Sequence, residues 1–207
     1  MDCHIVIITP TYNRNSDILK RCFDCVDSQT YKNWEQIVIV DDVNVNLHIA
    51  DDILEKYSNE KRRFAAVGYR SNNFGNTPRQ LAISMLKDKI DAKQYVIFFD
   101  DDNVMFPNYL QVFMDYFENN KAKEMAICKI VHLGPLPSHL GQPPKVIDGN
   151  PPKLQNIDTL QACIEQNIVK QYGWREDKGY LADGYTLENF ANNCNYGFID
   201  EILAIHL

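Results

Sequence analysis

The first half of the chain repeats one pattern, in which short apolar runs rich in β-branched residues alternate with stretches whose apolar residues recur at helical spacing. The apolar runs cover residues 5–8, 37–40, 64–67 and 95–99. Because each run is apolar throughout, we expect strands buried on both faces, as in a parallel sheet whose crossover helices lie on either side. The pattern therefore predicts an α/β protein with an open, mostly parallel sheet.

Helix-start signals lie between these predicted strands. Ser16 can cap a helix between the first and second runs. Thr77 and Pro78 are typical of the N-cap and the first position of a helix, and they lie between the third and fourth runs. The first half thus has the strand and helix order of repeated βαβ units.

The second half of the chain is less regular. We expect a helix over residues 107–119, a strand over 125–131, helical segments near 159–172 and 187–193, and a last strand within 198–205. Residues 132–153 hold six prolines, so this connection cannot be a helix. Long connections of this kind usually shape or cover a site, and a static connector is the alternative.

Polar residues follow three of the predicted strands. Residues 9–14 come after the first strand, Asp41 and Asp42 after the second, and Asp100, Asp101 and Asp102 after the fourth. Ligands of open α/β sheets bind beyond the carboxyl ends of the strands, so these side chains are candidates for one site. Three adjacent carboxylates repel one another unless a cation lies among them, and oxygen ligands suit Mg²⁺ or Mn²⁺. The structural alternative is that one Asp caps the next helix and the others are solvated.

Composition narrows the class of protein. The chain has 207 residues and a formal net charge of −7, which argues against nucleic acid as a partner because phosphate backbones select clustered Lys and Arg. No apolar stretch is long enough to span a membrane, and we expect a cytoplasmic protein, or one held at a membrane surface by a partner or an acceptor. The six cysteines lack the spacing of a disulfide scaffold, and Cys22 and Cys25 are expected in a helix core. Among five histidines without ligand-like spacing, His132 and His139 could reach a substrate.

Five ordered motifs resemble one known family. They are residues 8–14 (ITPTYNR), 29–35 (QTYKNWE), 40–42 (VDD), 73–76 (NFGN) and 99–102 (FDDD). In this order and spacing, the chain resembles the family 2 glycosyltransferases, strongly over residues 4 to 103 and weakly beyond. The resemblance implies one compact domain of the GT-A fold, with a Rossmann-like half at 1–103 that binds a nucleoside-diphosphate sugar and a smaller mixed half at 104–207 that binds the acceptor. It also implies transfer with inversion and a divalent metal, Mn²⁺ or Mg²⁺.

The resemblance also implies roles for individual residues. The implied donor-binding set is Thr9, Pro10, Tyr12, Arg14, Asp41, Asn76, Arg79, Asp100 and Asp101, with Asp41 as the base- or ribose-contacting acid. Asp100 and Asp102 match the ends of the family's D-x-D motif, whose last carboxylate binds the ion that bridges the two phosphates. Arg79 in the first turn of its helix could face phosphate. The structural alternative is that Arg79 is a solvent-exposed helix residue without a ligand.

The acceptor half must supply a base for the acceptor hydroxyl. Asp183 resembles the acid that precedes the family's last acceptor-domain helix, and we predict it as the base, with an N-cap role as its structural alternative. Glu176 and Asp177 are the alternative candidates for the base. We expect an ordinary pKa for the base, because an unperturbed carboxylate is already ionised at neutral pH. Trp174 could stack on an acceptor sugar or belong to the core.

Two departures from the family pattern leave the donor nucleotide and sugar open. Val43 and Asn44 replace the usual small turn, and residues 78–80 (PRQ) replace Ala-Arg-Asn. The acceptor is equally open and could be a glycan, a lipid-linked acceptor or another hydroxyl compound. Two other functions remain in view, a sugar-phosphate nucleotidyltransferase and a non-catalytic nucleotide-sugar or glycan-binding module. Every interpretation that includes a metal requires Asp100 and Asp102 to face open space. It would fail if both side chains were locked to arginines with no room for an ion or a phosphate.

Overall fold

One mixed sheet forms the centre of the protein. The computed structural model describes residues 3–88, 92–134 and 145–207. Within them the strands are β1 (His4–Thr11), β2 (Trp34–Val40), β3 (Arg62–Ala66), β4 (Gln94–Phe98), β5 (Val104–Met105), β6 (Met125–His132), β7 (Val146–Ile147), β8 (Ala162–Glu165) and β9 (Tyr196–His206). The helices are α1 (Ser16–Asp27), α2 (Asp51–Tyr57), α3 (Asn76–Ser84), α4 (Tyr109–Asn119), α5 (Gln166–Tyr172) and α6 (Ala182–Asn192), with short 3₁₀ segments at η1 (Val45–Leu47), η3 (Thr159–Gln161) and η4 (Glu176–Leu181).

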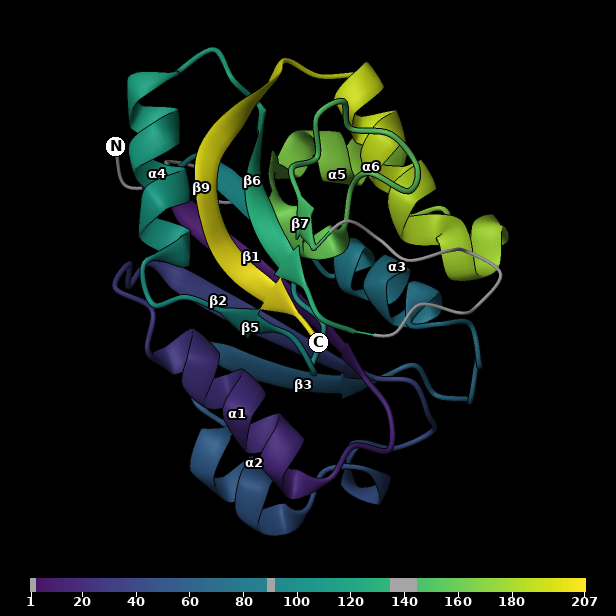
Figure 1. Cartoon of the computed structure of the whole chain (residues 1–207). Helices are drawn as coiled ribbons and strands as arrows, with labels where there is room; N and C mark the ends of the chain where they lie inside the picture. Colours follow the sequence, from purple (N-terminus) through teal and green to yellow (C-terminus); the bar gives the residue numbers. More distant parts are fainter. Residues whose placement is uncertain (1–2, 89–91, 135–144) are drawn as a thin grey trace.

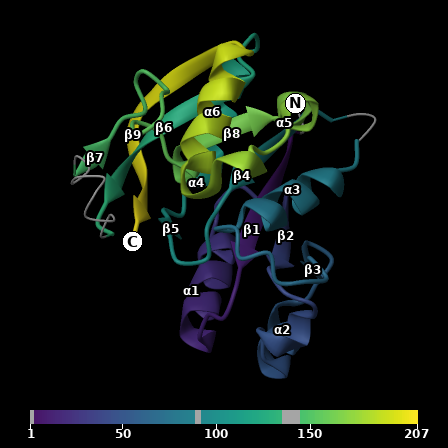
Figure 2. The same cartoon turned by 90° about the vertical axis from the view of Figure 1, so that its right-hand side faces the viewer.

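The strand order is β3-β2-β1-β4-β8-β6-β9-β5, with β7 paired to β6 (Figure 1, with β4 and β8 labelled in Figure 2). β1 runs parallel to β2 and β4, and β2 runs parallel to β3, which confirms the predicted parallel half. β8 runs antiparallel to both β4 and β6, whereas β6 and β9 are parallel. The second half is therefore mixed, as expected.

Helices cover both faces of this sheet. One core holds apolar side chains of α1, α2 and α4, and the other holds those of α3, α5 and α6. Along β1, Ile5 and Ile7 enter the first core while Val6 and Ile8 enter the second, because successive side chains of a strand point to opposite faces. Figure 2 looks onto the side that carries α3, α5 and α6. Burial on both faces explains why the runs of β1, β2 and β4 are continuously apolar. β3 lies at the edge of the sheet and is only partly buried, contrary to expectation.

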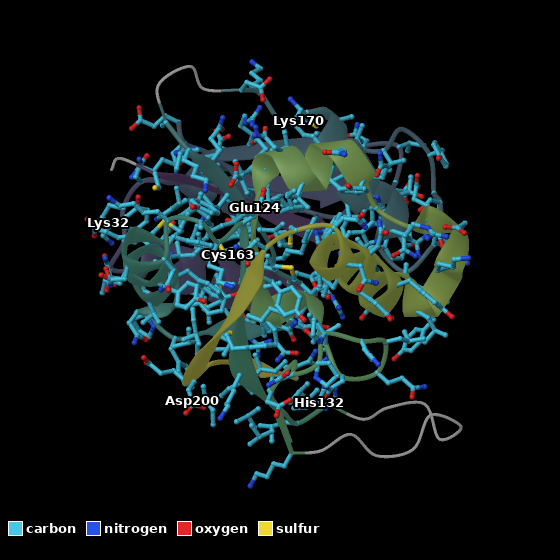
Figure 3. All side chains as sticks on the ribbon, turned by 90° about the horizontal axis from the view of Figure 1, so that it is seen from above. Lys32, Glu124, His132, Cys163, Lys170 and Asp200 are labelled. Atoms are coloured by element: carbon cyan, nitrogen blue, oxygen red, sulfur yellow. The ribbon has the colours of Figure 1, made fainter. Side chains whose placement is uncertain are left out.

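One element prediction was wrong. Residues 162–165 were expected within a helix but form β8, the strand between β4 and β6. Cys163 packs in one core while Ala162 and Ile164 pack in the other, which is strand alternation. Figure 3 shows Cys163 near the middle of the molecule, with Lys32 and Asp200 at its periphery. Short apolar runs do not distinguish strand from helix by spacing alone, and here pairing with two neighbours decides.

The predicted helix starts are correct to within a few residues. Asn15, not Ser16, caps α1, and its side chain accepts a hydrogen bond of 2.9 Å from the Ile18 N–H. α3 begins after Gly75 instead of at Thr77. His139 and much of the Pro-rich connection, with the proposed cover over the site, lie outside the described residues. In the described part of the chain, none of the helices has the length and apolar character needed to cross a bilayer.

Candidate functional site

A pocket of about 730 Å³ opens beyond the carboxyl ends of β1, β2 and β4. The predicted site residues that line it are Pro10, Tyr12, Arg14, Asp41, Asn76, Arg79, Asp100, Asp101, Asp102 and Asp183. They come from strand ends of the parallel half, from the start of α3 and from the start of α6. The two halves of the chain therefore meet in one site.

Thr9 is the predicted donor residue that the structure places elsewhere. Its side chain is completely buried, and its Oγ1 accepts a hydrogen bond of 2.9 Å from Gln36 Nε2 inside the core. The position lies one pleat before the strand end, so Thr9 cannot reach the pocket. Thr11, two residues on and on the same face, lines the pocket instead.

Arginines pair with the acidic triplet. Arg14 donates from Nε to Asp101 Oδ1 at 2.9 Å and from Nη2 to Asp102 Oδ2 at 2.6 Å. Arg79 pairs with Asp100 and also donates from Nη1 to the Phe74 carbonyl at 3.1 Å. Arg79 is buried, which excludes the solvated-helix alternative. The acids are thus bound to arginines, but the pocket beside them leaves room for a ligand.

The three acids differ in exposure. The side chains of Asp100 and Asp102 are 25% and 35% exposed, whereas that of Asp101 is 3% exposed. Burial raises the pKa of Asp101 to about 6, against the opposing charge of Arg14. Asp101 therefore serves chiefly to hold Arg14, and Asp100 and Asp102 are the carboxylates available to a ligand.

The carboxylates of this pocket suit one kind of metal site. Among the described residues there is no group of three His, Cys, Asp or Glu side chains that could hold an ion alone. Mg²⁺ and similar ions are commonly bound by one or two carboxylates together with substrate phosphates and water. Asp100 and Asp102 fit an ion that arrives with a diphosphate, and their arginine partners would then be free to face phosphate oxygens.

Asp183 lies in the first turn of α6 and lines the same pocket. The N-cap position belongs to Leu181, so the capping alternative does not hold. Burial raises the pKa of Asp183 to about 6, the negative charge of Asp158 adds to the rise, and the 2.7 Å hydrogen bond from the Gly184 N–H opposes it. The expectation of an ordinary pKa was wrong, because the site is more enclosed than a solvated loop.

The other acceptor-side candidates lie outside the pocket. Asp177 is bound by Arg175 at 2.9 Å and by Lys178 at 2.9 Å, and these bonds lower its pKa. Neither Asp177 nor Glu176 lines the pocket. Trp174 belongs to the core, where its Nε1 donates to Asn76 Oδ1 at 2.9 Å, and it does not form a stacking platform.

Two charged clusters combine predicted residues with residues that sequence reasoning missed. His206 Nδ1 lies 2.8 Å from Asp158 Oδ2, and the rings of His132 and His206 stack with centroids 4.4 Å apart. Burial disfavours the His206 imidazolium, but its bond to Asp158 outweighs burial and raises the pKa of His206 to about 9. All three line the pocket. Sequence reasoning singled out His132 but missed Asp158 and His206, for which the only signal was the position of His206 at the end of the last strand.

The second cluster surrounds Asp41. Its carboxylate accepts hydrogen bonds from Arg70 Nη1 at 2.7 Å, from the Ser71 N–H at 3.0 Å and from the Asn72 N–H at 3.2 Å. The Arg70 guanidinium lies 3.2 Å from the centroid of the Tyr12 ring. Asp41 therefore organises residues 70–72, and Arg70 and Tyr12 form the wall of the pocket there.

Gly75 sits where the pocket tolerates no side chain. Its φ is +75°, and an added Cβ would lie 2.9 Å from Arg79 Nη1 and 3.2 Å from Pro10 Cβ. We expect Gly75→Ala to lower the free energy of unfolding by about 2 kcal/mol, from the left-handed backbone and from crowding. Gly68→Ala is the matched control, since Gly68 has φ +93° and nothing within 4 Å of an added Cβ. Urea unfolding measures both, and equal losses would contradict the crowding argument.

These features define an α/β protein with a ligand pocket at its strand ends, in which acids and arginines of a parallel half face an acid of a mixed half. The model of the family "Glycosyl transferase family 2" matches residues 6–163, more than half of the chain. The chain belongs to that family, as its motifs indicated.

Comparisons with known proteins agree with this assignment. The chain is similar to the uncharacterized glycosyltransferase MJ1057 of Methanocaldococcus jannaschii, with 25% identity over 117 residues that cover 56% of this chain and 38% of the relative. Its fold is similar to that of TarS from S. aureus, with a TM-score of 0.75, 14% identity and coverage of 98% of this chain and 36% of TarS. It is also similar to the mannosyltransferase PcManGT from Pyrobaculum calidifontis, solved with GDP-Man and Mn²⁺, with a TM-score of 0.70, 12% identity and coverage of 98% and 56%. The expected GT-A fold is confirmed, and the chain spans well under two thirds of each of these relatives.

Proposed function

We propose that this chain transfers a sugar, with inversion, from a nucleoside-diphosphate sugar to a hydroxyl acceptor, and that it uses Mn²⁺ or Mg²⁺. The observation that carries the proposal is that Asp100, Asp102 and Asp183 line one and the same pocket. Carboxylates for a metal–diphosphate thus share this pocket with a base from the other half of the chain. Structures of the similar TarS with UDP and with UDP-GlcNAc, and of PcManGT with GDP-Man and Mn²⁺, support a nucleotide-sugar donor.

On the donor side, the leaving diphosphate gains negative charge as the sugar departs. A bound divalent ion would supply part of the charge that stabilises this leaving group. Arg14 and Arg79 already lie among the acids, and each can donate to phosphate oxygens once its carboxylate partner binds elsewhere. Arg70 and Tyr12, at the Asp41 end of the pocket, then face the nucleotide.

On the acceptor side, Asp183 would take the proton from the attacking hydroxyl. Inversion needs one displacement, so a single base on the acceptor side is sufficient. A pKa of about 6 leaves most of the Asp183 population ionised at neutral pH and makes it a stronger base than an ordinary Asp. Raising the pKa of this carboxyl by burial therefore suits the role.

A thermal-shift panel tests the proposal. The purified chain is heated with UDP, GDP, dTDP and CMP sugars, each with Mn²⁺, Mg²⁺ or chelator. A donor at one hundred times its Kd should stabilise the fold by about 2.7 kcal/mol, and only when metal is present. No stabilisation by any sugar nucleotide would contradict the proposal. Release of pyrophosphate from a nucleoside triphosphate would favour a nucleotidyltransferase, and stabilisation without any turnover would favour a binding module.

The pH dependence of transfer gives a second check. Asp183 must be deprotonated to act, and its pKa is raised to about 6, so activity should be low below that pH and rise as pH increases through it. We expect kcat/KM to increase about tenfold for each pH unit below 6 and then to level off. The measurement is a rate profile at saturating metal from about pH 5 to about pH 8. A profile that is flat through this range would exclude a base with the raised pKa.

A further inference from the structure

Two exposed aromatic rings meet at the mouth of the pocket. Phe74 is 65% exposed and Tyr180 is 46% exposed, and both line the pocket. Their ring centroids are 5.7 Å apart with an interplanar angle of 84°. Phe74 comes from the loop before α3 and Tyr180 from η4, so each half of the chain contributes one ring. Large aromatic side chains left exposed beside a pocket commonly contact a ligand.

The backbone holds this aromatic pair in place. Phe74 has φ +52°, a left-handed conformation that is uncommon for a bulky residue, and its carbonyl accepts from Arg79 at 3.1 Å. Asn73 Nδ2 donates to the Glu176 carbonyl at 3.3 Å. Asn76 Nδ2 donates to the Gly179 carbonyl at 2.8 Å, next to Tyr180. Strained backbone that is fixed on both sides is typical of functional positions.

Tyr180 also lies near the proposed base. Tyr180 precedes Asp183 by three residues, and both line the pocket. Burial raises the pKa of the Tyr180 hydroxyl, and the charges of Asp183 and Asp158 add to the rise, as expected for groups close together. The acceptor hydroxyl must reach Asp183, so a molecule resting on these rings is positioned as the acceptor.

We propose that Phe74 and Tyr180 form an acceptor subsite for a sugar ring, so that the acceptor is a glycan. This inference rests on the proposed function and names its acceptor class. A pyranose ring presents a face of C–H groups that packs on an aromatic ring, while its hydroxyls point outward and can reach Asp183. A linear polyol has hydroxyls but no such face. The T-shaped pair offers two apolar surfaces of this kind at the edge of an acidic pocket.

The test uses simple probes and a matched control. Saturation-transfer NMR measures binding of methyl glycosides of glucose, galactose, mannose and N-acetylglucosamine, and of glycerol and ribitol, to the chain saturated with nucleotide and the diamagnetic ion Mg²⁺. We expect at least one glycoside to bind the wild type and neither polyol to do so. Phe74→Ala and Tyr180→Ala should each lower the affinity of the chain for that glycoside by about tenfold. Tyr185→Ala, which removes a tyrosine that is 38% exposed and outside the pocket, should leave it unchanged.

Each contrary result is distinct. The acceptor subsite would be overturned if no glycoside binds the wild type, or if the two alanine variants bind the glycoside as tightly as the wild type does. It would also be overturned if the polyols bind as tightly as the glycosides. Weaker stabilisation of both variants by the nucleotide sugar in the thermal-shift assay would assign the rings to the donor sugar and also overturn it. If no nucleotide sugar stabilises even the wild type, the proposed function fails instead.

Discussion

Asp183→Asn is expected to lower the rate of sugar transfer by about 10³-fold, because a positioned general base typically contributes 10²–10⁴-fold. Asn keeps the size of the side chain and can still accept from the Gly184 N–H, which bonds to Asp183 Oδ1 at 2.7 Å. Binding of the nucleotide sugar should therefore be retained. The measurement combines kcat from product formation with the donor-induced thermal shift.

The control for this experiment is Asp177→Asn. Asp177 was the alternative base, but it is bound to Arg175 and Lys178 outside the pocket, so its loss should leave kcat within about twofold. Full activity of Asp183→Asn would remove Asp183 as the base. Loss of donor binding in the same variant would show a role in the donor site and not in proton transfer.

Local signals in the sequence predicted the parallel half of the sheet. The apolar runs at β1, β2 and β4 indicate burial on both faces, and this signal lies in each strand's own residues. The acids and Arg14 follow these runs directly, so sheet geometry alone brings them to one edge. The convergence of these residues therefore follows from the order of strands and polar turns along the chain.

Features that depend on distant segments could not be derived in this way. β8 is a strand because it pairs with β4 and β6, and its four residues carry no strand-specific pattern. His206 and Asp158 are 48 residues apart in sequence, and their bond depends on where β9 ends. The raised pKa of Asp183 likewise comes from enclosure by both halves of the chain.

The arginine pairs show how long-range contacts change the chemical picture. Arg14 and Asp101 are 87 residues apart, and sequence reasoning assigned them separately to the donor site without linking them. Arg79 connects Asp100 to the carbonyl of Phe74, so the acid proposed for metal binding and the aromatic pair proposed for the acceptor share one side chain. Movement of Arg79 toward a phosphate would therefore alter both the ion pair with Asp100 and the hydrogen bond to the Phe74 carbonyl.

Asp102→Asn is expected to remove metal-dependent binding of the donor and to lower transfer by about 10²–10³-fold, the usual cost of losing one charge-stabilising group. The amide oxygen of the variant side chain can still accept from Arg14, and the pair is partly exposed, so the free energy of unfolding should change by less than about 1 kcal/mol. The decisive measurement is the difference in thermal shift between Mn²⁺ and chelator with the donor present, which should fall to zero. Asp88→Asn, which breaks the exposed pair with Lys170 away from the pocket, should keep the full difference. A metal-dependent shift that survives in Asp102→Asn would contradict the assignment of Asp102 as a carboxylate that the ion requires.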